Sequence, residues 1–102
     1  MTKSLYSLLE AVGLPVPTGL VNQSIESISC DSHSLGEKCL FLGLPGEKVD
    51  GGTFWRNALA AGAIAALIGP EAAASNAPID KDPVVVVPDP VAHWIGEIAS
   101  AF

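Results

Sequence analysis

The sequence predicts an α/β fold: a mixed, partly parallel sheet of about five strands with helices packed on it. Three observations predict this fold: short apolar runs have strand length, amphipathic segments lie between them, and glycine or proline marks most transitions. From residue 39 onward strands and helices are expected to alternate, which is typical of parallel crossover units. With 102 residues, 49% of them hydrophobic, the chain is long enough to bury one core as a single domain over 1–102.

The first part of the chain is expected to form one helix and two strands. A helix is predicted over 4–12, because leucine and valine recur at the spacing of one helix face and Gly13 can end it. A proline-rich connection over 14–20 precedes a strand over 24–30, which mixes isoleucine with small polar residues. The run over 39–44 is almost continuously apolar, as in a strand buried on both faces.

The middle of the chain is expected to continue the alternation. Thr53 can cap a helix that runs to Gly62, and the apolar run over 63–68 predicts the next strand. A short helical turn is expected over 70–75. The run of valines over 84–87 then predicts a buried strand, because β-branched residues favour strands.

The last helix is expected to begin at a proline. Asp89 is predicted to cap it, with Pro90 at the first helical position. Its buried stripe is predicted to comprise Val91, Trp94, Ile95, Ile98 and Phe102. His93 precedes one residue of this stripe and is expected to be a partly exposed surface residue rather than a catalytic one.

The charge pattern argues against nucleic acid as a partner. The formal net charge is −6, and the 5 lysines and arginines are scattered, whereas nucleic-acid-binding proteins cluster these residues. No apolar stretch has the length of a membrane span or the pattern of a signal peptide. We therefore expect a cytoplasmic protein without membrane contact, in which Cys30 and Cys39 are free thiols.

Few features of the sequence suggest an enzyme that acts on its own. It has no phosphate-binding Gly-x-x-x-x-Gly-Lys-Ser/Thr loop, no Gly-x-Ser-x-Gly elbow and no His-Glu-x-x-His pair. Cys30, His33 and Cys39 fit no standard zinc spacing, and a fourth ligand would have to be the distant His93. We expect no catalytic residue and no metal site; the alternative is a small enzyme with Cys30 or Cys39 as nucleophile.

Two polar loops, over 31–38 and 45–52, border the first strand pair and are the candidate binding site. Ligands of open α/β folds collect at strand ends, where loops diverge. Ser32 offers a hydroxyl and Lys48 a mobile cation, and the glycines of the second loop, Gly46, Gly51 and Gly52, leave backbone N–H groups free to approach an anion. The alternative is a pair of ordinary surface turns.

Three segments of the chain resemble the N-terminal domain of the Mur ligase family. They are DSH at 31–33, CLFLGLPGEKVDGG at 39–52 and AAGA at 60–63. The family signature reads approximately D-S-R, then L-F-x-A-x-x-G-x-x-x-D-G, then A-x-x-x-G-A, and the order and spacing match. The similarity extends over essentially the whole chain. Two departures are His33 in place of the usual arginine, and Lys38-Cys39 in place of a common Gly-Asp pair.

The resemblance implies that this domain binds the UDP part of a UDP-muramoyl peptide. The residues that match the binding positions of the family are Cys30, Ser32, Glu47, Lys48 and Val49. The supporting loop residues are Asp31, His33, Gly46, Asp50 and Gly51. An imidazole cannot reproduce the donor fork of an arginine, so the departure at His33 affects the contacts expected around Ser32.

Within the family, the form Val49-Asp50-Gly51 resembles the ligase that adds the third peptide residue to UDP-N-acetylmuramoyl-L-alanyl-D-glutamate in bacterial peptidoglycan biosynthesis, which supports cell shape and division. That reaction uses ATP and Mg2+, which the resemblance assigns to central and C-terminal domains missing here. The chain is therefore expected to be a truncated UDP-sugar-binding domain, with those missing domains as its partners, that binds without catalysing. The alternatives are the equivalent domain of the ligase that adds the terminal D-Ala-D-Ala dipeptide, and a non-catalytic binding module of the same fold.

Overall fold

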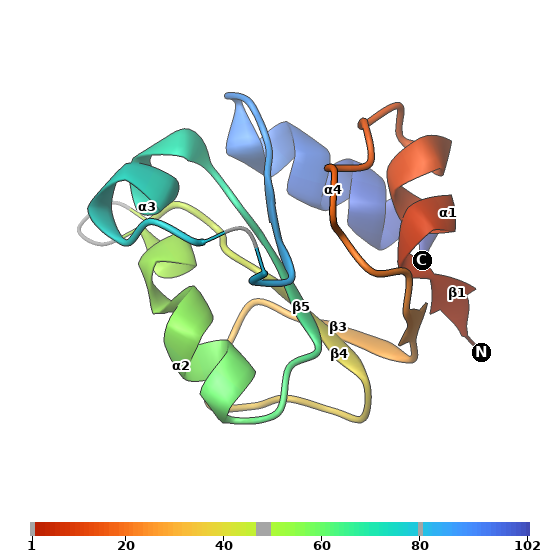
Figure 1. Ribbon diagram of the computed structural model, residues 1–102, viewed down its shortest axis with the longest axis horizontal. Coiled ribbons are helices and arrows are strands. Elements are labelled where there is room, and N and C mark those ends of the chain that lie inside the picture. Colours follow the sequence, from red (N-terminus) through yellow and green to blue (C-terminus); the bar gives the residue numbers. More distant parts are fainter. Residues whose placement is uncertain (1, 47–49, 80) are drawn as a thin grey trace.

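The computed structural model describes residues 2–46, 50–79 and 81–102, and it has three layers. Helices α1 and α4 cover one face of the main sheet, and α2 and α3 cover the other (Figure 1). In chain order the elements are β1 (Lys3–Ser4), α1 (Leu5–Ala11), β2 (Ser24–Ile25), β3 (Ser27–Ser29), β4 (Cys39–Leu42), the 3-10 helix η1 (Gly51–Phe54), α2 (Trp55–Ala60), β5 (Ala65–Ile68), α3 (Pro70–Ser75), β6 (Val84–Val86) and α4 (Val91–Ala101).

The main sheet is parallel and its strands follow the chain order β3-β4-β5-β6. Leu40 of β4 lies opposite both Ile28 of β3 and Ala65 of β5. Helical segments connect β4 to β5 and β5 to β6, whereas a loop without a helix connects β3 to β4. A separate antiparallel pair joins β1 to β2. The α/β fold class is confirmed, and the expected mixture of strand directions arises from two sheets rather than one.

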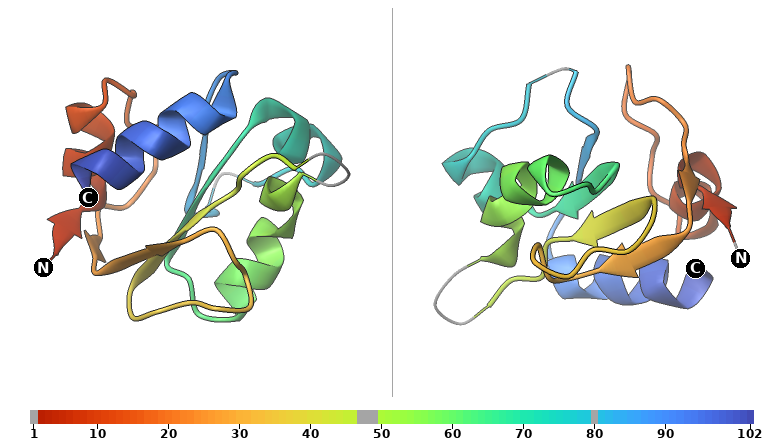
Figure 2. Two further views of the ribbon diagram at one scale, coloured as in Figure 1. Left: turned by 180° about the vertical axis from the view of Figure 1, so that it is seen from behind. Right: turned by 90° about the horizontal axis from the view of Figure 1, so that it is seen from below.

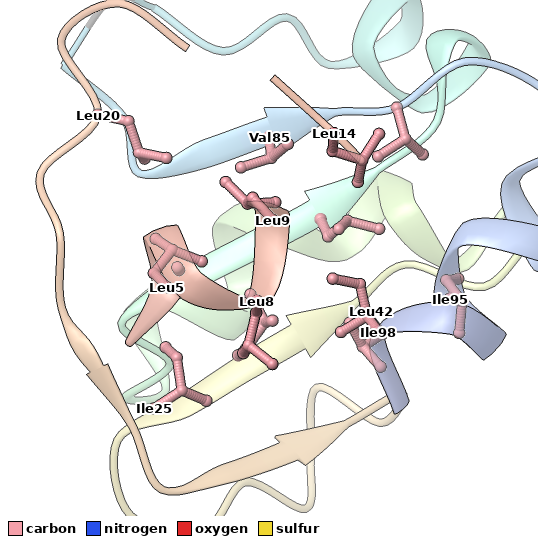
Figure 3. Packing of buried hydrophobic residues seen from close by; sticks show 14 of the residues in the cluster. Leu5, Leu8, Leu9, Leu14, Leu20, Ile25, Leu42, Val85, Ile95 and Ile98 are labelled. Carbon is pink, nitrogen blue, oxygen red and sulfur yellow. The ribbon is translucent and has the colours of Figure 1, made fainter. Parts of the chain in front are cut away.

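Alternation along the strands divides the core into two clusters. Leu40 and Leu42 face α1 and α4, where they pack with the leucines of α1 and with Ile98 (Figure 3). Phe41 points to the opposite face and packs with Trp55 and Ile68. Because successive side chains of a strand point to opposite faces, one continuous apolar run supplies both clusters. The expected burial of this strand on both faces is confirmed.

The single strand expected over 24–30 is wrong. The segment divides at Glu26 into β2, which pairs with β1, and β3, which pairs with β4. The backbone N–H of Glu26 donates to the carbonyl of Lys38 at 3.1 Å. The break brings Ile25 and Ile28 to the same cluster, although residues three apart would face opposite sides of one regular strand.

Two expected helix caps are also displaced. Thr53 lies inside η1, and Asp50 caps this 3-10 helix by accepting a hydrogen bond from Gly52 N–H at 2.8 Å. Asp89 lies one residue too early, because Pro90 occupies the cap position of α4 and makes no side-chain cap hydrogen bond. The expected helical turn over 70–75 is present, and the opening helix expected over 4–12 forms over Leu5–Ala11, with Ser4 as its cap.

The last strand and helix are less buried than expected. Val86 of β6 is 45% exposed, whereas Val84 and Val85 are buried. Along α4, Val91, Ile95 and Ile98 are buried, but Trp94 and Phe102 are partly exposed. Figure 2 shows α4 beside α1, with the two ends of the described chain close together. Among the described residues, no helix is long and apolar enough to cross a membrane.

Candidate functional site

A depression of about 260 Å³ lies where β3 and β4 end. Both strands run in the same direction, so the loops that follow them meet at one edge of the sheet. The residues that line it are Cys30, Asp31, Ser32, His33, Phe41, Gly51 and Phe54. Polar groups of the first loop therefore face aromatic rings from β4 and η1.

The loop after β3 is held in shape by its own short polar side chains. Ser29 Oγ donates to the carbonyl of Ser34 at 2.9 Å and accepts from Asp31 N–H at 3.1 Å. Asp31 Oδ1 accepts from His33 N–H at 2.8 Å, which forms an Asx turn. Among the described residues, the Ser32 hydroxyl makes no hydrogen bond within the chain, so it is available to a ligand.

The opposite wall of the depression is set by a close approach of two glycines. A Cβ atom on Gly43 would lie 2.4 Å from the Cα of Gly52, a distance that only glycine at residue 43 permits. The backbone N–H of Gly51 donates to the carbonyl of Leu44 at 3.0 Å. The first turn of η1 therefore packs directly on the end of β4, and Asp50 caps it.

Five of the residues expected at the site lie together in the depression. They are Cys30, Asp31, Ser32, His33 and Gly51. Asp50 does not line it and instead caps η1, and Gly46 is exposed outside it. Glu47, Lys48 and Val49 lie outside the described residues.

Two aromatic residues of the depression were not expected at the site. Phe41 belongs to a run that fits a buried strand, and its ring is only 1% exposed. Phe54 was expected on a helix running from Thr53 to Gly62, yet it lies in a 3-10 turn and is 45% exposed. The sequence carried one signal for it: Phe54 lies two residues after the end of a loop that was already a candidate.

The lysine and arginine side chains that the structure describes lie away from the depression. Lys38 is 3.8 Å from Glu26, and Arg56 donates to the side chain of Asn76 and to the carbonyl of Ala77. Neither residue lines the depression, nor do the other described cations, Lys3 and Lys81. Within the described part of the chain, hydroxyl, imidazole and backbone N–H groups are therefore the donors available there.

The two cysteines are free thiols, as expected, and they occupy different environments. Cys39 is fully buried in β4, whereas Cys30 lines the depression. Although Cys30 is exposed overall, desolvation where it lines the depression raises the pKa of its thiol, which disfavours the thiolate that a nucleophile requires. No group of three or more His, Cys, Asp or Glu side chains among the described residues could hold a metal ion.

Comparison with known proteins identifies the family. The family model described as "Mur ligase family, catalytic domain" matches residues 24–102. Over its whole length, the chain is 66% identical to a UDP-N-acetylmuramoyl-L-alanyl-D-glutamate--2,6-diaminopimelate ligase of Prochlorococcus marinus (strain MIT 9313). It is 59% identical to the ligase of the same name from Synechococcus sp. (strain WH7803), and each match covers 20% of the relative's own length. The ligase of that name from Trichormus variabilis (strain ATCC 29413 / PCC 7937) is 40% identical over 85% of the chain and 17% of its own length. The chain spans about a fifth of the length of the first two relatives. The chain therefore belongs to the Mur ligase family.

Proposed function

We propose that this chain is the UDP-binding domain of a ligase that extends UDP-N-acetylmuramoyl-L-alanyl-D-glutamate by a third residue during peptidoglycan synthesis in the cytoplasm. The observation that carries the proposal is the depression at the carboxyl ends of β3 and β4, where the 30–33 loop meets Gly51 and Phe54. The names of the relatives support this substrate and point to 2,6-diaminopimelate as the third residue. We also propose that residues 1–102 form a single domain.

The depression has the size and chemistry for one end of this substrate. Its volume of about 260 Å³ is slightly below the roughly 300–1,000 Å³ of pockets that enclose a whole small molecule. A uridine group could enter it, with the sugar and peptide lying outside. The Ser32 hydroxyl and the backbone N–H groups of the two loops can donate to uracil or phosphate oxygens, so a cationic side chain is not required.

Amide bond formation with ATP is assigned to the rest of the protein. The sequence has no phosphate-binding Gly-x-x-x-x-Gly-Lys-Ser/Thr loop. The described residues also offer no cluster of carboxylates suited to Mg2+. The domain holds the substrate, and the remaining four fifths of a protein of its relatives' length would supply ATP, Mg2+ and the amino-acid site.

Two alternatives have different support. The ligase that adds the terminal dipeptide would carry an equivalent domain, but the relatives of this chain are named for a reaction with diaminopimelate. A binding module that has lost its ligand site is supported by His33, which the resemblance places where the family usually has arginine. Failure of the chain to bind any uridine nucleotide would favour the second alternative.

Calorimetric titration of a matched pair of serine variants tests the proposal. Ser32 lines the depression, while Ser34 lies in the same loop outside it, so Ser32→Ala and Ser34→Ala make the same change in two places. We expect wild type and Ser34→Ala to bind UMP and the full UDP-muramoyl dipeptide, and neither to bind ATP. Ser32→Ala should lower the affinity for the uridine ligands by about 2- to 10-fold, as expected for loss of one hydrogen bond. Equal affinity of the two variants for UMP would contradict the assigned site.

A further inference from the structure

Phe54 exposes an aromatic ring into the depression although its neighbour is fully buried. Its side chain is 45% exposed, whereas Trp55 is 1% exposed. The Trp55 ring packs in the core beneath α2, and its indole N–H donates to the carbonyl of Asn76 at 2.7 Å. Single exposed apolar side chains are common on protein surfaces, so the significance of Phe54 lies in its position on the lining of the candidate ligand site.

The backbone that carries Phe54 is held on both sides. At the start of η1, Asp50 Oδ1 accepts from Gly52 N–H, and Thr53 Oγ1 donates to the carbonyl of Asp50 at 2.8 Å. At its end, the buried Trp55 anchors the chain in the core. The backbone at Phe54 therefore needs little further ordering when a ligand binds, which favours affinity.

The two walls of the depression differ in chemistry. One is the polar loop at 30–33, and the other is the Phe54 ring; Phe41, which is almost fully buried, also lines the depression. A planar heterocycle with polar edges matches both walls, because its face can stack on a ring while its edge accepts and donates hydrogen bonds.

We propose that Phe54 is the stacking platform for the nucleotide base, with the base held between its ring and the 30–33 loop. The inference rests on the proposed function and adds to it a residue that determines affinity for the base. Stacking tolerates any base, so the polar loop would select uracil while Phe54 supplies binding strength.

Three variants test this role: Phe54→Leu removes the ring and keeps an apolar side chain, Phe54→Tyr keeps the ring, and Val86→Ala is the control. Val86 is also 45% exposed but lies on β6, away from the depression. Affinity for UMP is measured by calorimetry, and the uracil H5 and H6 resonances are followed by NMR. Dispersed amide spectra confirm that each variant is folded.

We expect Phe54→Leu to weaken UMP binding roughly tenfold or more, and Phe54→Tyr and Val86→Ala to remain within about twofold of wild type. The uracil H5 and H6 resonances should shift upfield on binding to wild type and Phe54→Tyr, through the ring current, but not on binding to Phe54→Leu. If Phe54 only stabilised the fold, the upfield shift of the uracil resonances would not depend on the presence of its ring.

Three outcomes would overturn the inference. If wild type binds UMP and Phe54→Leu binds it equally well, the stacking role fails while the proposed function stands. If Phe54→Leu lowers the affinity for the full UDP-muramoyl dipeptide but not for UMP, the ring contacts the sugar instead of the base. If wild type binds no uridine ligand, the proposed function fails and the stacking role fails with it.

Discussion

Replacing Gly43 by alanine tests the contact that holds η1 against the end of β4. The new Cβ atom would lie 2.4 Å from the Cα of Gly52 and 3.1 Å from Cγ2 of Ile68, whereas carbon atoms prefer about 3.5–4.0 Å. Relief requires one backbone to move by about 1 Å, yet Gly43 N–H is bonded to the carbonyl of Leu67 at 2.8 Å. The clash therefore cannot relax by a simple side-chain rotation.

Overpacking of this kind costs about 2 kcal/mol, which lowers the melting temperature of a domain of this size by roughly 8–16 °C. Gly96 provides the matched control, because it lies in α4 with nothing within 4 Å of its added Cβ. Gly96→Ala should raise stability by about 0.5–1 kcal/mol, since alanine favours helix. Thermal unfolding of both variants, followed by circular dichroism, measures the two shifts.

The two alanine variants should shift the melting temperature in opposite directions. An unchanged or raised melting temperature for Gly43→Ala would refute the close approach of β4 and η1. It would also remove one of the contacts that place η1, and with it Phe54, at the end of β4.

Three further perturbations test the local structure. Asp50→Ala removes the cap of η1 and should cost about 1 kcal/mol of unfolding free energy in urea, whereas Asp50→Asn should retain most of it; equal losses in the two variants would contradict the cap. Trp55→Phe removes the indole donor and leaves the carbonyl of Asn76 without this partner, at a cost of about 1–3 kcal/mol by the same measurement; no loss would refute the hydrogen bond. Burial raises the pKa of the Cys30 thiol, so in a Cys39→Ser background the pH midpoint of its alkylation by iodoacetamide should lie above that of an unstructured cysteine peptide. Because this pKa is higher in the folded state, its small contribution to stability is present below the unfolded pKa and is lost as pH rises through the folded pKa; a midpoint at or below that of the peptide would contradict the burial.

Much of the fold follows from periodicity in the sequence. The helix spacing of the leucines in α1 and the apolar run of β4 predict elements that the structure contains. The division of 24–30 into two strands depends on partners that are distant in the chain, β1 and β4, so local pattern alone does not reveal it. One local sign exists: Ile25 and Ile28 are three residues apart, which does not suit one alternating strand buried on one face.

The candidate site also has one part that the sequence predicts and one part that it does not. Its polar half is predictable, because Asp31, Ser32 and His33 follow a strand and cannot all be buried. Its aromatic half depends on how Gly51–Phe54 winds. A 3-10 helix has three residues per turn, so its side chains do not point in the directions expected for a helix with 3.6 residues per turn, and one of them can point outward. Phe54 does so, whereas Trp55 points into the core.

Amide mapping by heteronuclear NMR is the most direct test of the central claim that this domain holds the UDP end of the substrate. The isotope-labelled chain is titrated with UDP-N-acetylmuramoyl-L-alanyl-D-glutamate, and with ATP as the control ligand, up to millimolar concentration. The proposal predicts that the UDP ligand shifts the amides of residues 30–33 and 51–54 while ATP shifts none of them. Shifts confined to other surfaces, equal shifts with ATP, or no shift with either ligand would contradict it.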